Sequence, residues 1–113
     1  HLEAYSSFGI TGIFGANLFS AIGSADGVKA MGKTGEIKVV AFDAPTRIVD
    51  DLKSGLVDLA IAQHPAEIGY MGVMVAFGHV TGNPVPVSVG TGFTVMTADN
   101  IDDPNISKYV YSD

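Results

Sequence analysis

Residues 36–82 decide the fold, and their sequence is EIKVVAFDAPTRIVDDLKSGLVDLAIAQHPAEIGYMGVMVAFGHVTG. Two apolar, β-branched runs in this stretch predict buried strands, at residues 36–42 and 57–62. Each run is followed by a segment of helical length that ends in glycine, at residues 44–55 and 65–82. Because strands alternate with helices of about ten residues or more, the stretch predicts parallel strand pairing with right-handed crossovers.

The segments on either side of this stretch extend the pattern and then change it. The run ITGIFG, residues 10–15, predicts another strand, and a helix is expected from about Leu18. Beyond residue 83 the sequence has two strand-like pieces, at 86–89 and 93–97, and ends in a polar, aromatic stretch that we expect on the surface. The predicted strands are apolar on both faces, which is typical of a sheet covered by helices on both sides. We therefore predict the α/β fold class, with a parallel-sheet, Rossmann-like lobe.

Composition limits the classes of function. The 113 residues carry a net charge of −6 and no basic cluster, which disfavours nucleic acid as a partner. Cysteine is absent, so the chain has neither a disulfide framework nor a thiolate nucleophile. The most apolar stretch, residues 68–80, is too short to span a membrane and predicts a helix buried on most sides.

A phosphate-loop pattern is present but stands in the wrong context. Residues 27–35, GVKAMGKTG, match G-x-x-x-x-G-K-T, which normally follows a strand and opens a helix. Here a helical segment precedes the pattern and a strand follows it, so we interpret Gly32 and Gly35 as a helix end. The three histidines lack metal-ligand spacing, and no nucleophile is paired with a base. We predict no cofactor, no metal ion and no enzymatic activity.

A polar residue follows each of the three predicted parallel strands, namely Asn17, Asp43 and Gln63. Ligands of open parallel sheets bind beyond the carboxyl ends of the strands, so these side chains are expected side by side at one edge. Two amides and a carboxylate can each grip neighbouring hydroxyl groups, which suits a sugar or a polyol. Local roles are the alternative: Asn17 and Asp43 can cap the helices that follow, and Gln63 can satisfy loop backbone groups.

The stretches IFGANLFSAIGSADGVKAMGK and IKVVAFDAPTRIVDDLKSGLVDLAIAQHPAEIGYMGV resemble the C-terminal part of type I periplasmic sugar-binding proteins, the ribose-binding-protein family. The matching features are the Asn after the first strand, the V-V-x-F-D segment and the I-A-Q-x-P segment, in the family's order. The resemblance covers roughly residues 10 to 113. It implies that Asn17, Asp43 and Gln63 hydrogen-bond to a bound sugar, whereas Arg47 is expected to pair with Asp50 or Asp51.

The resemblance also implies an architecture and a setting. Family members clamp the ligand between two lobes and deliver it to the permease of an ABC importer, in the periplasm or tethered outside the cytoplasmic membrane. By that comparison residues 1–63 and about 93–113 belong to the C-terminal lobe, and about 64–92 associate with the N-terminal lobe. If the chain is truncated, its apolar helix is expected to be exposed and to associate. An effector-sensing domain of a LacI-type transcriptional regulator, which shares the two-lobed fold, is the alternative.

Overall fold

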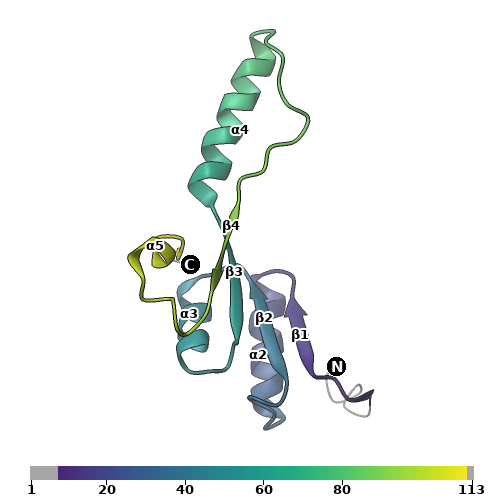
Figure 1. Ribbon diagram of the computed structural model, residues 1–113. Coiled ribbons are helices and arrows are strands. Elements are labelled where there is room, and N and C mark those ends of the chain that lie inside the picture. The colour runs from purple at the N-terminus through teal and green to yellow at the C-terminus, as the bar shows by residue number, and fades with distance from the viewer. Residues whose placement is uncertain (1–7, 112–113) are drawn as a thin grey trace.

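The computed structural model describes residues 8–111 of the 113-residue chain. The elements in chain order are β1 (Gly12–Gly15), α2 (Leu18–Ala30), β2 (Lys38–Phe42), α3 (Thr46–Lys53), β3 (Leu59–Gln63), α4 (Pro65–Val80), β4 (Phe93–Met96) and α5 (Pro104–Ser107). The sheet has the order β1-β2-β3-β4; the first three strands are parallel and β4 is antiparallel to β3 (Figure 1). The predicted α/β class with a mostly parallel sheet is confirmed.

The helices end where the sequence predicts. Gly32, Gly55 and Gly82 follow α2, α3 and α4 with φ of 65°, 75° and 77°, the left-handed region that glycine enters without steric cost. The phosphate-loop pattern accordingly covers the last turn of α2 and the turn after it, which lies before strand β2. The interpretation of this pattern as a helix end is confirmed.

Helices α2 and α3 cover only one face of the sheet. A single row of paired residues on that face is buried across all four strands, made of Gly15, Ala41, Ala60 and Met96. The expectation that helices cover both faces is wrong for the described residues. The reason is topological: the three parallel strands are sequential neighbours, so both right-handed crossovers return on the same side.

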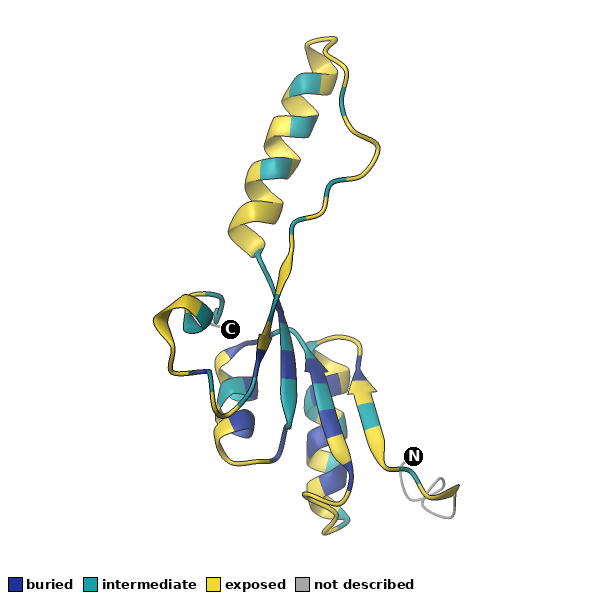
Figure 2. Cartoon of the chain, in the orientation of Figure 1, coloured by how far each residue is buried: buried dark blue, intermediate teal, exposed yellow. Residues whose placement is uncertain are grey.

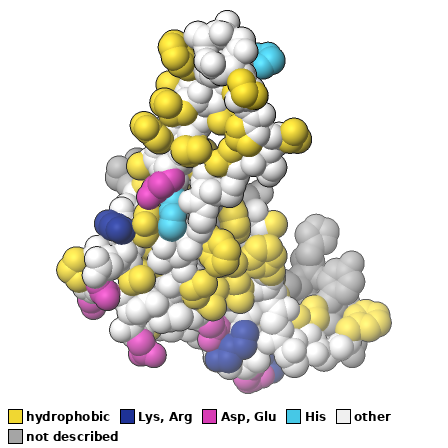
Figure 3. Space-filling view, turned by 45° about the horizontal axis from the view of Figure 1, so that its top comes forward, with side chains coloured by type: hydrophobic (Ala, Val, Ile, Leu, Met, Phe, Trp, Pro, Cys, Tyr) yellow, Lys and Arg dark blue, Asp and Glu magenta, His cyan; other side chains and the backbone are white. Residues whose placement is uncertain are grey.

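The opposite face of the sheet is apolar and open, and we call it the open face. Its residues are half-buried or exposed (Figures 2 and 3): Phe14, Val40, Phe42, Leu59, Ile61, Phe93 and Val95. Phe14 is 56% exposed and Phe93 is 65% exposed. Large apolar side chains at such exposure mark a surface that another element or partner covers.

Helix α4 and the segment that follows it project away from the α/β body (Figure 1). No residue of α4 is buried, so the expectation of a helix buried on most sides is wrong for this chain. The radius of gyration is 17.4 Å, compared with about 13 Å for a compact domain of this length. The accessible surface is 7060 Å², compared with about 5,900 Å² for a compact monomer of this mass.

The segment that follows α4 also differs from what the sequence predicts. Residues 86–89 form no strand; they run beside α4 and border an apolar groove of about 540 Å³ with it. Pro84 and Pro86 have no N–H group to donate, which disfavours a strand at this point. The polar, aromatic end of the chain forms α5 and then returns to the body, where Tyr111 makes an isolated β-bridge with Pro45.

Candidate functional site

Asp43 follows β2 and has an unusual backbone conformation. Its φ is 79°, and it is the one non-glycine residue with positive φ among residues 8–111. Its N–H donates to the carbonyl oxygen of Ile61 at 3.0 Å, so the neighbouring strand holds the turn in place. Non-glycine residues in this region cost about 1–3 kcal/mol and are concentrated at functional sites. The side chain does not cap α3, whose N-cap is Pro45 without a side-chain hydrogen bond, so the capping alternative for Asp43 is wrong.

Gln63 ends β3 and lies against Asp43. Its Nε2 donates to Oδ1 of Asp43 at 2.7 Å, across 20 residues of sequence. Both residues are half-buried. The bond uses the nitrogen of the Gln63 amide and one oxygen of the carboxylate. Oε1 of Gln63 and Oδ2 of Asp43 therefore remain as acceptors at the edge of the sheet.

Asn17 stands at the end of β1 and is the N-cap of α2. Its Oδ1 accepts from the backbone N–H of Ser20 at 2.9 Å, and Oγ of Ser20 accepts from the backbone N–H of Asn17 at 3.1 Å. The capping role predicted as an alternative is therefore real. However, the cap uses only the amide oxygen, and Nδ2 of Asn17 has no partner within the described residues. Capping and ligand binding are compatible in this side chain.

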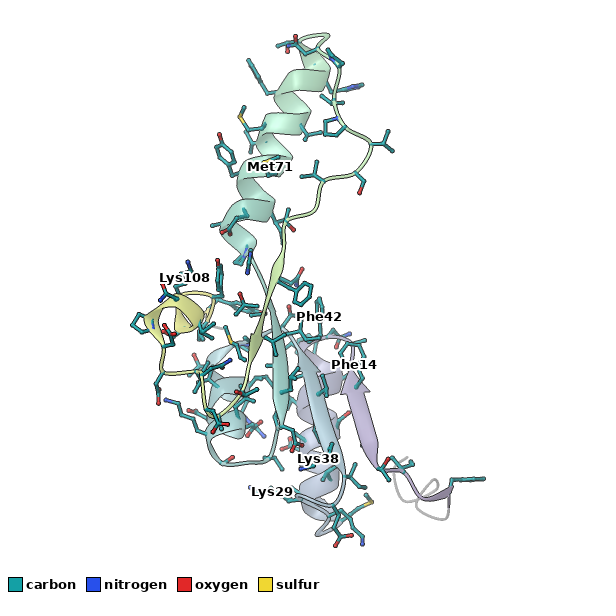
Figure 4. All side chains as sticks on the ribbon, viewed as in Figure 1. Phe14, Lys29, Lys38, Phe42, Met71 and Lys108 are labelled. Carbon is teal, nitrogen blue, oxygen red and sulfur yellow. The ribbon has the colours of Figure 1, made fainter. Side chains whose placement is uncertain are left out.

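The three predicted residues lie at the ends of three adjacent parallel strands. The structure joins Asp43 and Gln63 directly and leaves Asn17 without a hydrogen bond to either. Together they offer two acceptor oxygens and an amide donor, which match the hydroxyl groups of a sugar or polyol. Lys38 lies at the opposite end of the sheet, where it pairs with Asp58 at 2.8 Å (Figure 4).

The segments that lead into and out of α4 cross beside Gln63. The ring of His64 stacks on the ring of Tyr109, with centroids 3.8 Å apart and planes 10° from parallel. Its Nε2 lies 2.8 Å from Oγ1 of Thr94 on β4. This cluster ties the start of α4 to β4 and to the C-terminal tail. Sequence analysis missed it; the aromatic residues of the sequence KYVY, 108–111, were the available signal.

Gly92 lies beside His64, in the segment that leads from α4 into β4. Alanine at this position is expected to destabilise the protein. Its φ is 77°, and an added Cβ would lie 3.1 Å from Nδ1 and 3.2 Å from Cε1 of His64. We expect Gly92→Ala to lower the free energy of unfolding by about 1–3 kcal/mol, measured by urea denaturation. Gly90→Ala is the control, because a Cβ there meets nothing within 4 Å. Equal stability of the two variants would contradict the expectation.

Arg47 has a structural role. Its guanidinium donates to Oδ1 of Asp26 at 2.6 Å and to Oδ2 of Asp51 at 2.8 Å, which links α3 to α2. The hydrogen bond to Asp26 and then that to Asp51 raise the pKa of Arg47 above its ordinary value. The predicted pairing with Asp51 is confirmed, and the link to Asp26 is an addition.

Two further features bear on the kind of site. Within residues 8–111, no three His, Asp or Glu side chains are grouped so that they could hold a metal ion. In the same part of the chain, no helix combines the length and apolar character needed to cross a membrane.

Polar residues at the carboxyl ends of adjacent parallel strands lie where open α/β sheets bind their ligands. Residues 2–84 match the periplasmic binding protein domain. The chain belongs to the periplasmic binding protein family. A comparison with curated protein sequences found no match.

Among solved structures, the chain is similar to solute-binding proteins. An ABC transporter solute-binding protein from Agrobacterium vitis, bound to α-D-tagatopyranose, is 54% identical with a TM-score of 0.89. The match covers 99% of this chain and 38% of that chain. A second Agrobacterium vitis protein, bound to D-fucose, is 28% identical over 96% of this chain and 38% of its own, with a TM-score of 0.82. A solute-binding protein from Agrobacterium radiobacter, in complex with D-arabinose, is 28% identical over 97% of this chain and 38% of its own, with a TM-score of 0.83.

Proposed function

We propose that this chain is part of a solute-binding protein that captures a sugar between two lobes and delivers it to the permease of an ABC importer. The observation that carries the proposal is the Asp43–Gln63 pair at the carboxyl edge of the sheet, with Asp43 in a strained conformation. The protein that is 54% identical was solved with a pyranose sugar, and those that are 28% identical were solved with D-fucose and D-arabinose. Its action is capture, in which no bond is made or broken.

In the proposed site, Asp43 and Gln63 accept hydrogen bonds from sugar hydroxyl groups, and Asn17 donates one through Nδ2. Charged acceptors make the stronger hydrogen bonds, so Asp43 contributes most of the affinity. Its geometry supports this role, because the Gln63 amide orients the carboxylate before the ligand arrives. A preorganised acceptor loses less entropy on binding.

The proposed division into lobes is supported by the shape of the chain. Residues 1–63 and about 93–113 would form the C-terminal lobe, and about 64–92 would associate with an N-terminal lobe. The projection of α4 and the segment after it supports this division. The chain spans 38% of the length of the relatives above, so the remaining 62% of such a protein is available to cover α4 and the open face. Association of a truncated chain through α4 stays a prediction.

Residues around the crossing would then act as hinges. Gln63–His64 lead into α4 and Gly90–Gly92 lead out of it, so a rotation between lobes has to be absorbed there. The sugar drives closure because it binds the closed arrangement more tightly than the open one. Delivery to a permease and a location in the periplasm, or tethered outside the cytoplasmic membrane, complete the proposal. The alternative, an effector-sensing domain of a LacI-type regulator, is not better supported by the similar structures.

The proposal predicts sugar binding by the gene product that contains this chain. We expect calorimetric titration with D-tagatose, D-fucose and D-arabinose to give a dissociation constant in the micromolar range or below, about −8 kcal/mol or better, for at least one of them. Citrate and glutamate serve as control solutes, because the predicted set of acceptors does not suit carboxylates. Absence of binding by every sugar, or tighter binding of a control, would refute the proposal.

A further inference from the structure

A cavity beside Gln63 brings a second part of the chain to the candidate site. Its volume is about 480 Å³, within the range of small-molecule sites. It is lined by Gln63, Pro65, Ile68, Gly69 and Tyr111. The first four come from the end of β3 and the start of α4, whereas Tyr111 comes from the C-terminal tail.

The backbone holds Tyr111 in this position. Tyr111 forms a β-bridge with Pro45, and its N–H donates to the carbonyl oxygen of Ala44 at 3.4 Å. Ala44 and Pro45 are buried and directly follow Asp43. The tail therefore ends against the same turn that places the Asp43 carboxylate. Tyr111 is fixed relative to Asp43 through the backbone and shares a cavity with Gln63.

A second contact holds the C-terminal tail, at Tyr109. Tyr109 stacks on His64, which is the residue after Gln63. Lys108 places its Nζ 4.9 Å from the centroid of the Tyr109 ring, which adds a cation–π contact. The tail therefore contacts Ala44, which follows Asp43, and His64, which follows Gln63. Ring stacking at Tyr109 and backbone pairing at Tyr111 together hold the tail beside the candidate site.

We propose that Tyr111 is the aromatic wall of the ligand site and selects a sugar with an apolar C–H face. This inference rests on the proposed function. A half-buried tyrosine offers a broad apolar ring with a polar tip, and Pro65 and Ile68 extend the apolar wall. Gln63 supplies the polar group in the same cavity. A sugar ring with hydroxyl groups along one edge and C–H groups on one face matches this combination of apolar wall and amide group.

The test is calorimetric titration of the gene product with D-tagatose, or with the tightest sugar of the three if another binds better. We expect Tyr111→Ala to weaken binding about tenfold or more, and Tyr111→Phe to stay within about threefold, because the ring face carries the contact. Tyr111→Leu keeps an apolar side chain beside Pro65 and Ile68, keeps the backbone bridge to Pro45 and loses the ring face, so it should weaken binding while preserving the fold. Lys29→Ala is the control, since Lys29 is exposed near the end of α2 and does not line the cavity.

The outcomes separate this inference from the proposed function. If the wild-type protein binds no sugar, the proposed function fails and this inference fails with it. If it binds a sugar and folded Tyr111→Leu binds equally tightly, only the aromatic wall is overturned. A merely structural tyrosine would weaken binding of all sugars alike. A wall residue also changes the ratio of affinities for D-tagatose and its C4 epimer D-fructose, and an unchanged ratio would overturn the inference.

Discussion

Gly15→Ala is expected to unfold the α/β body at denaturant concentrations that the wild-type chain tolerates. A Cβ on Gly15 would lie 2.3 Å from Cα and 2.5 Å from N of Ala21, both backbone atoms of α2. Ala21 is fully buried, so the helix can accept the new methyl group only by moving off the sheet. Overpacking against backbone costs more than the usual 1–3 kcal/mol, and we expect a loss of about 3–5 kcal/mol.

Two other glycines separate this steric effect from the general effect of alanine. Gly12 lies on the same strand, β1, and a Cβ there meets the carbonyl oxygen of Lys38 at an ordinary 3.6 Å. Gly23 lies inside α2 with nothing within 4 Å, so alanine should stabilise that helix by up to about 1 kcal/mol. Urea denaturation followed by far-ultraviolet circular dichroism measures all three variants. A Gly15→Ala midpoint near that of Gly12→Ala would show that the close approach is not as tight as the geometry requires.

The order of strands and helices was predictable because the local patterns agree with it. The run 36–42 contains β2, and the amphipathic segment 44–55 contains α3, with Ile48 and Leu52 buried against the sheet. Periodicity reports which residues are apolar, and it does not report what covers them. For that reason the open face and the exposure of α4 could not be predicted from the strands and helix themselves.

The sequence predicted the location of the candidate site but not its detailed geometry. Parallel pairing brings the ends of β1, β2 and β3 to one edge, and the alternation of strands and helices in the sequence is enough to predict that pairing. The positive φ of Asp43 has no sequence signal, because aspartate before Ala-Pro is compatible with an ordinary extended turn. The hydrogen bond from Gln63 depends on the register of β3, which is set by packing rather than by any local motif. Tyr111 reaches the site through tertiary contacts alone.

Replacing Asp43 is expected to cause the largest loss of ligand affinity. Asn is the informative replacement, because it tolerates a φ of 79° and keeps an oxygen that can accept from Nε2 of Gln63. The variant therefore preserves the turn and loses only the charge-assisted hydrogen bonds to the sugar. Such bonds contribute about 1.5–3 kcal/mol, so Asp43→Asn should weaken sugar binding about 10- to 100-fold in calorimetric titration.

Asp43→Ala should weaken binding further, by more than about 100-fold, because alanine also loses the Gln63 bond and pays the cost of the left-handed conformation. Asp50→Asn is the control for net charge, since Asp50 is exposed on α3, away from the strand ends. If Asp43→Asn binds as tightly as Asp50→Asn, the carboxylate does not contact the sugar. The strain at Asp43 would then serve only to turn the chain from β2 into α3, and Gln63 would be its structural partner rather than a ligand residue.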